Sequence, residues 1–543
     1  MNERAPDAPE RHAWIAPVVL AALVVLAYAP SLGAGFLGYD DDWLIERSPV
    51  MHDASASALA AIVGDFSRET RLVLGAEYLP VRDLVTWASV RVLGASAPGL
   101  RLVQLAIYVA AVLAFRAWLR RLLGPGLPAE IAALALALHP VHAESVAWLA
   151  GIKDVLALLF SGLALAVHAG PAHARRRGLV ALFVLLACFS KAVCVVLPLL
   201  LVLSDAWMAR PLDRVTLGIT LALAALAAIV HASVGAVVGM YAPMPGGSRL
   251  AAAATMAPVA FRYALRTVLL EPASVVYEVP DRTISDPIAL ASAAGLVALA
   301  AAALLLFRRG ERRPLLLLLF VAVALAPVSQ VLAPIQHRMA DRYLLVALAA
   351  PCIGLGIAGA RLPSDRLRLA LGAALALGLG IATADRAATF ADPIALFSET
   401  TARAPSSPLG PYQLGVIVQR RDPRTAELAF REALDRDAMR TDVGRSAADD
   451  LAILLAGSGR AGEAITLLEA THARYPHDPR VAHNLAVLLD DRGEHERART
   501  LLVDVMREHP RYARAWQSYR ARFGEPPFAP PTPSRYDAGA RSW

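Results

Sequence analysis

Lysine is almost absent from this chain. Only Lys153 and Lys191 occur among its 543 residues, and both lie in the apolar half. The net charge of +7 therefore comes from arginine. In a soluble protein this charge would suggest nucleic acid, but here the arginines cluster in short connectors between apolar runs. That placement is typical of membrane orientation and argues against a nucleic-acid partner.

Cysteine is also scarce. Cys188, Cys194 and Cys352 all fall in apolar runs, so they imply no disulfide framework and are read as small buried hydrophobes. No small-residue cleavage site follows the first apolar run, 14–32, which we therefore interpret as a retained membrane span. The Ala-, Arg-, Leu- and Gly-rich composition is typical of a bacterial chain from a GC-rich genome, which places these spans in the inner membrane.

Apolar residues make up 57% of the chain, and its mean hydropathy is +0.50, as in polytopic membrane proteins. The stretch 256–271 carries Arg262 and Arg266 and is expected at the membrane interface. The apolar runs of spanning character are 14–32, 100–119, 129–148, 152–169, 178–207, 215–239, 288–307, 314–334, 343–360 and 367–384.

Arginine positions constrain how these runs cross. By the positive-inside rule, the arginine-rich connectors should be cytoplasmic. The run 178–207 has such connectors at both ends and is longer than the roughly 20 residues of one span. A helical hairpin with its turn near Phe189-Ser190-Lys191 resolves this conflict. About eleven crossings result, with residues 1–13 cytoplasmic and everything after residue 384 external.

The predicted fold is all-α, a membrane helix bundle followed by an α-solenoid. A 34-residue period relates Ala452 to Ala486, Gly459 to Gly493 and Ala464 to Ala498, as in tetratricopeptide repeats. The expected parts are a cytoplasmic N-terminus 1–13, a membrane domain 14–390 with a large external loop 33–99 carrying surface helices 55–66 and 80–94, about three external repeats in 391–524 with a capping helix 513–523, and a disordered tail 525–543.

An acidic stretch, Tyr39-Asp40-Asp41-Asp42-Trp43, follows the first span. Three adjacent carboxylates near hydrocarbon repel one another, so the stretch is either a solvated loop end or part of a site. The external face also collects most unusual polar residues of the membrane half. These candidate cavity residues are His139, His142, Glu144, Lys153, Asp154, Lys191, His337, Arg338, Asp341 and Arg342.

Several of these residues have simpler interpretations. The histidines fit an interfacial role, and Lys153 with Asp154, or Asp341 with Arg342, fits a local ion pair. A zinc site of His139, His142 and Glu144 matches no closed structural spacing. Lys191 resists such an interpretation, because a lysine within an apolar run costs about 2.5–3.5 kcal/mol at mid-membrane unless it reaches water or an anion. Carboxylates and cations on one face together favour a catalytic cavity that binds an anionic leaving group.

Four stretches resemble the landmarks of the transmembrane and tetratricopeptide-repeat O-mannosyltransferase family, which belongs to the polytopic GT-C class of glycosyltransferases using lipid-phosphate-linked sugars. The landmarks span residues 36–354, and the trailing repeats match the family's architecture. Tyr78-Leu79-Pro80-Val81-Arg82 resembles the family's Tyr-Arg-Pro stretch with the arginine displaced. The four stretches are GFLGYDDDWLI, HPVHAESVAWLAGIKDVLALLF, FSKAVCVVLPLLLVLSDAW and ADRYLLVALAAPCIGLG.

The resemblance implies inverting transfer of a mannose-like sugar from a polyprenyl-phosphate donor to a hydroxyl, with a Ser/Thr acceptor polypeptide on the repeats. The family's paired acidic residues match Asp40 and Asp41, either of which would be the general base; Asp42 is extra. Lys191, Arg338 and Arg342 would hold the donor phosphate. A divalent metal is left open.

Two other functions remain compatible with the sequence. In a membrane-anchored interaction protein the repeats would act alone, although such a scaffold needs one span and has no use for Lys191. A transporter would fit the broken helices, but no repeat relates the two halves of the membrane region.

Overall fold

A computed structural model describes residues 14–171, 173–270 and 274–530. The predicted cytoplasmic segment 1–13 and residues 531–543 of the predicted tail lie outside the described residues. The chain forms two compact units. The first contains residues up to Leu37, Ala76–Val275 and Val279–Ala391, and the second contains Gly38–Gly75, Val276–Glu278 and the chain from Asp392 onward.

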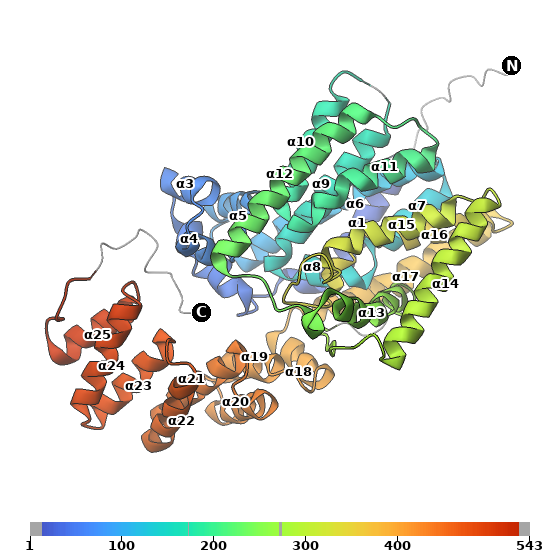
Figure 1. Ribbon diagram of the computed structural model, residues 1–543. Helices are drawn as coiled ribbons and strands as arrows, with labels where there is room; N and C mark the ends of the chain where they lie inside the picture. The colour runs from blue at the N-terminus through green and yellow to red at the C-terminus, as the bar shows by residue number, and fades with distance from the viewer. Residues whose placement is uncertain (1–13, 172, 271–273, 531–543) are drawn as a thin grey trace, which may run out of the picture. The chain divides into compact units, whose positions relative to one another are not determined.

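The first unit is a helix bundle, and no strand occurs among its described residues. Helices α6, α9, α10 and α12 pack successively against one another, and α7 packs against both α16 and α17 (Figure 1). The helices of this unit are α1 (Ile15–Leu32), α5 (Pro80–Leu93), α6 (Ala97–Leu123), α7 (Leu127–Ala137), α8 (Ala143–Ala147), α9 (Ile152–Ala169), α10 (Arg176–Ser190), α11 (Leu197–Met208), α12 (Arg214–Val238), α13 (Arg249–Leu269), α14 (Pro287–Arg308), α15 (Arg313–Leu325), α16 (Ala349–Ala360) and α17 (Asp365–Thr389).

Side-chain caps set where the long helices begin. Asp213 accepts a hydrogen bond from the backbone N–H of Thr216 at the start of α12, and Asp286 does the same for α14. Ser96 and Ser364 cap α6 and α17 in this way. Such caps satisfy backbone donors that have no partner within the helix.

Six helices of the described residues are long and apolar enough to cross a membrane, namely α1, α6, α12, α14, α17 and the segment Leu149–Ala169 that contains α9. The other predicted runs form shorter helices. For example, the run 129–148 is divided into α7, the 3-10 segment Pro140–His142 and α8. Pro140 lacks a backbone N–H, so it cannot continue α7 in α-helical geometry.

The structure contains the predicted hairpin at 178–207. Helix α10 ends at Ser190, a 3-10 segment covers Ala192–Val196, and α11 continues from Leu197. Arg176 at the start of α10 lies 3.1 Å from Asp213. Asp205, near the end of α11, lies 2.9 Å from His168 at the end of α9, whose carbonyl also accepts a hydrogen bond from Arg176. Both hairpin ends therefore meet at one end of α9.

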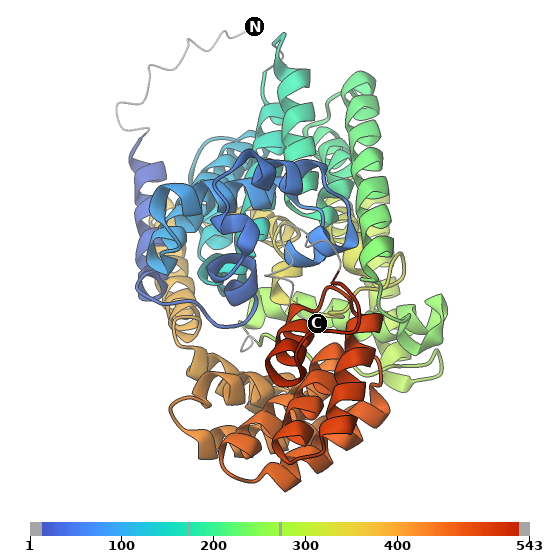
Figure 2. The same cartoon turned by 90° about the vertical axis from the view of Figure 1, so that its left-hand side faces the viewer.

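The second unit contains the repeats as stacked helix pairs (Figures 1 and 2). The small residues of the 34-residue period, Ala452, Ala464, Ala486 and Ala498, are all fully buried at helix crossings. The helices are α18 (Pro393–Arg403), α19 (Leu409–Val418), α20 (Pro423–Asp437), α21 (Asp442–Gly457), α22 (Ala461–Arg474), α23 (Pro479–Asp491), α24 (His495–Glu508) and α25 (Ala513–Phe523).

Residues 38–75, expected in the large external loop, belong to this second unit. They form a π-helical turn at Asp42–Glu46 and the short helices α2 (Pro49–His52), α3 (Ala56–Gly64) and α4 (Arg68–Val73). Glu69 lies 3.0 Å from Arg511, which follows α24. The predicted surface helices 55–66 and 80–94 correspond to α3 and α5, which belong to different units.

Candidate functional site

Lys191 lies where the hairpin changes helix type. Its backbone is extended, with φ −158°, so it interrupts the helix while its N–H still bonds to the carbonyl of Ala187 at 3.0 Å. Its side chain is only 10% exposed and forms an ion pair with Asp154 of α9. Asp154 is almost completely buried and also accepts a hydrogen bond from Ser145 at 3.3 Å. The cation predicted to be costly in hydrocarbon therefore has an anionic partner.

Arg342 forms a second buried ion pair with Glu144 of α8. The backbone N–H of Arg342 also donates to Glu144, at 3.2 Å, so one carboxylate fixes both the main chain and the side chain. Both cations lie close to the ring of Tyr343. Lys191 Nζ is 5.8 Å and Arg342 Cζ is 5.6 Å from the centre of its ring. Cations near an aromatic face gain electrostatic attraction from the ring.

A third set of ion pairs lies next to the pair of Lys191 and Asp154, at the start of α9. Lys153, the neighbour of Asp154, lies 2.5 Å from Glu77. Arg82 of α5 contacts Glu77 at 3.4 Å and Asp83 at 2.7 Å. Although burial would raise the pKa of Glu77, the charges of Lys153 and Arg82 lower it to about 2. Glu77 is therefore an anion at neutral pH, and it holds Lys153 of α9 and Arg82 of α5 in place.

A pocket opens beside Lys191, Arg342 and Tyr343. The space free of protein atoms beside these residues is about 430 Å³, open solvent included. Its remaining walls are mostly apolar, and they come from α9, the hairpin, α15 and the segment after Tyr343. Among these wall residues are Ala157, Val193, Leu197, Leu200, Leu345 and Val346.

The two cations retain hydrogen-bonding capacity after pairing. An ammonium has three N–H donors and a guanidinium has five, more than one carboxylate partner uses. The pocket therefore combines two paired cations with apolar walls. This combination suits an amphipathic anion, because the charged end meets donors while the apolar chain is removed from water.

The sequence suggested two local ion pairs. In the structure their four side chains pair instead with residues far away in the sequence. Lys153 pairs with Glu77 and Asp154 with Lys191, although the two are adjacent in sequence. Asp341 pairs with Arg266 of α13 at 2.7 Å, whereas Arg342 pairs with Glu144. Each side chain therefore connects separate segments of the bundle.

The histidines lie near this group but have contacts of their own. His139 Nε2 is 3.4 Å from the carbonyl of Thr267, and His142 Nδ1 is 2.7 Å from the hydroxyl of Tyr108. Burial and the charge of Arg342 lower the pKa of His337 to about 3, so His337 is neutral at pH 7. Among the described residues, no cluster of three or more His, Cys, Asp or Glu is arranged to hold a metal ion.

Two other groups of predicted site residues are not among the residues that line the Lys191 pocket. Arg338 contacts Asp281 at 2.8 Å and the carbonyl of Val279 at 2.7 Å. Asp40 and Asp41 belong to the second compact unit, where Asp42 pairs with Arg47 at 2.7 Å. The pairing of Asp40 or Asp41 with the cations of the first unit stays a prediction.

Sequence reasoning did not select Glu77, Asp83, Ser145 or Tyr343. Glu77 directly precedes the Tyr78-to-Arg82 stretch, so an unexplained carboxylate next to a suspected motif was a usable signal. Tyr343 directly follows two selected residues. Ser145 carries no comparable signal, because its role depends on how α8 meets α9.

Comparisons with known proteins identify the repeats. Residues 455–522 match the tetratricopeptide repeat family. In structure, the chain is similar to the Archaeoglobus fulgidus oligosaccharyltransferase tethered with an acceptor peptide, with 14% sequence identity and a TM-score of 0.37. That similarity covers 70% of this chain and 55% of the archaeal chain, so this chain spans about half the length of that relative. No curated protein matches the sequence.

Proposed function

We propose that this protein is a membrane glycosyltransferase of the GT-C class, which moves a mannose-like sugar from a polyprenyl phosphate to a hydroxyl. The observation that carries the proposal is the apolar pocket with Lys191 and Arg342 in its wall. A scaffold has no use for two buried cations, each held by its own buried carboxylate. A donor with a phosphate and an isoprenoid chain has the two chemical properties that the pocket offers.

In this proposal the donor phosphate binds between Lys191 and Arg342, and the isoprenoid chain follows the apolar walls. Asp154 and Glu144 keep the two cations in position before the donor arrives. Preorganised cations stabilise the charge that develops on the phosphate as the sugar leaves, without reorganising during the reaction. The ring of Tyr343 lies beside both cations and forms part of the wall of this site.

The chemical step is a displacement at the anomeric carbon. The acceptor hydroxyl oxygen forms a bond to this carbon, and the bond from the carbon to the phosphate oxygen breaks, its electron pair leaving with the lipid phosphate. Asp40 or Asp41 takes the hydroxyl proton. The transition state resembles an oxocarbenium ion, as in glycoside hydrolysis, so a nearby carboxylate also stabilises it.

The repeats would present the acceptor, a Ser/Thr-containing polypeptide. Alternate helices of the solenoid carry a polar series: Tyr412 donates to Asp450 at 3.0 Å, and Asn484 donates to Asp449 at 2.8 Å. Arg480 contacts Asp449 at 2.5 Å. Asp449 is fully buried, whereas Tyr412, Asp450 and Arg480 are partly exposed. Solenoids bind extended ligands along one face, and these three exposed side chains have donors and acceptors that suit a peptide backbone.

The test is sugar transfer by the purified full-length protein from a synthetic polyprenyl-phosphate mannose to a Ser/Thr peptide. Arg342→Lys keeps the charge but loses the planar fork of donors, so we expect a higher KM for the donor and a lower kcat. Arg309→Gln removes an exposed arginine from the connector between α14 and α15 and is the matched control. Full activity in Arg342→Lys, or equal losses in both variants, would exclude a phosphate role for Arg342.

The alternative is a membrane-anchored interaction protein. It is favoured by one observation, that the repeats are the segment with a family match. It predicts that residues 391–524 on a foreign membrane anchor complement a deletion strain and capture the same partners as the whole chain. The enzyme would be favoured if this fragment fails to complement the deletion strain and mass spectrometry finds altered periplasmic glycans in that strain.

A further inference from the structure

A second pocket lies at the opposite end of the hairpin from Lys191. It is formed where α10 begins, α11 ends and α12 begins, and the space free of protein atoms there is about 870 Å³, open solvent included. Four arginines contribute to its wall, against two aspartates: Arg176, Arg177, Arg210 and Arg214 with Asp205 and Asp213. No step of the proposed transfer reaction uses this pocket.

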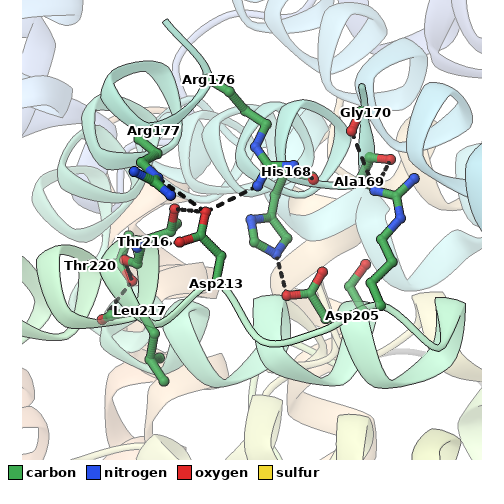
Figure 3. Close-up of polar contacts among 12 residues, drawn as sticks. His168, Ala169, Gly170, Arg176, Arg177, Asp205, Asp213, Thr216, Leu217 and Thr220 are labelled. Carbon is green, nitrogen blue, oxygen red and sulfur yellow. Dashed lines mark hydrogen bonds and ion pairs between the residues drawn. The ribbon is translucent and has the colours of Figure 1, made fainter. Parts of the chain in front are cut away.

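The two aspartates are already occupied by protein groups. Arg176 and Arg177 both point to Asp213, at 3.1 and 3.2 Å (Figure 3). Asp205 contacts the ring of His168 at 2.9 Å in the same view. Partial burial would raise the pKa of Asp213, but hydrogen bonds from Thr216, Arg177 and Arg176 hold it well below its usual range. One carboxylate is therefore shared by two guanidinium groups.

The other two arginines carry charge that no carboxylate balances. Arg210 donates to the carbonyl oxygens of Ala169 and Gly170, at 2.7 and 3.3 Å, which orients the side chain without neutralising it. Arg214 is exposed at the start of α12, and neither arginine is in an ion pair within the described parts of the chain. The pocket wall thus carries an excess of positive charge.

Apolar side chains are exposed on the same wall. Leu212 is 44% exposed and Val215 is 51% exposed, and both line the pocket beside the arginines. A soluble phosphate would gain nothing from these two side chains. A phospholipid would place its phosphate against the arginines and the first carbons of its acyl chains against Leu212 and Val215.

We propose that this pocket binds the phosphate headgroup of an anionic phospholipid. The pocket lies at the arginine-rich ends of the helices, which the positive-inside rule predicts to be cytoplasmic. Anionic lipids of that leaflet attract basic groups near the membrane surface. The lipid would join the beginning and end of the hairpin to α12, and so would stabilise the segment that carries Lys191. The assignment is independent of the proposed transferase activity.

Native mass spectrometry of the full-length protein, with phosphatidylglycerol as the probe, tests this proposal. Arg177→Gln with Arg214→Gln removes two of the more exposed arginines and spares Arg176 and Arg210, which have backbone contacts. We expect retention of phosphatidylglycerol to fall about five-fold or more in this double variant, and the loss to shrink at high salt. Arg308→Gln with Arg309→Gln, at exposed sites in another connector, is the matched control and should retain the lipid.

Two further measurements distinguish the phosphate of a lipid headgroup from free phosphate. Phosphatidylcholine, which carries no net charge, should neither bind at this pocket nor compete. Inorganic phosphate at the same concentration should not displace the lipid, and Leu212→Ser should weaken lipid binding but not phosphate binding. Unchanged phosphatidylglycerol retention in the arginine variant, equal retention of phosphatidylcholine, or full displacement by inorganic phosphate would each overturn the assignment. Thermal unfolding midpoints close to that of the unmodified protein confirm that the variants fold.

Discussion

Lys153 and Asp154 are neighbours at the start of α9, yet their side chains pair in different directions. Lys153 lies 2.5 Å from Glu77 in the segment before α5, whereas Asp154 pairs with Lys191 at the hairpin turn. One turn of α9 therefore connects two ion-pair groups that come from segments far apart in the sequence. If Lys191 binds the donor phosphate, Asp154 is the group that positions it and Lys153 marks the edge of the site.

The pair of Asp154 with Lys191 gives the first prediction. Asp154→Asn leaves a buried ammonium without its carboxylate, and removing one partner of a buried pair costs about 3–5 kcal/mol. Asp154→Asn combined with Lys191→Met removes both charges and should recover most of this loss. Thermal unfolding of the detergent-purified protein measures both variants. The double variant should still lack sugar transfer, because the proposed phosphate ligand is gone; recovery of activity would contradict that role for Lys191.

The second prediction concerns acid. The pKa of Glu77 is lowered from 4.5 to about 2 in the folded protein. A lowered carboxyl pKa contributes stability above the unfolded pKa, and this contribution is lost as pH falls from about 4.5 toward 2. We expect the unfolding midpoint to fall across this window in the unmodified protein, and the fall to be smaller in Glu77→Gln. The same slope in both proteins would show that other carboxylates control acid sensitivity.

Much of the architecture could be predicted because its causes are local. Arginines at both ends of one apolar run required the hairpin at Lys191, and small residues at a 34-residue spacing indicated the repeats. The ion-pair partners of the site residues could not be predicted from local sequence patterns. Glu144 meets Arg342 across 198 residues of sequence, and no spacing rule relates them. Asp154 was selected, but its adjacent lysine suggested the wrong partner.

The third prediction tests the repeat turns. Gly493 has φ +90°, a left-handed conformation that costs an alanine about 1–2 kcal/mol. Gly493→Ala should therefore increase hydrogen exchange in α23 and α24. Gly457→Ala is the control, because this glycine is helical and an added methyl group would meet no atom within 4 Å. Equal exchange in the two variants would show that the turn conformation does not limit the stability of this repeat.

The last prediction separates the three adjacent aspartates of the second unit. Asp42 pairs with Arg47 at 2.7 Å, which gives it a local structural role, whereas Asp40 and Asp41 are the proposed bases. We expect Asp40→Asn or Asp41→Asn to lower sugar transfer by about 10²–10⁴-fold, the usual contribution of a general base, with expression unchanged. Asp42→Asn should retain sugar transfer. The substitution should lower only the stability of the protein. The asparagine preserves the size of the side chain, but its amide is not basic and cannot accept the proton at neutral pH. Full activity in both single variants and in the Asp40→Asn, Asp41→Asn double variant would remove this stretch from the mechanism, and the donor pocket at Lys191 would then need a base from elsewhere.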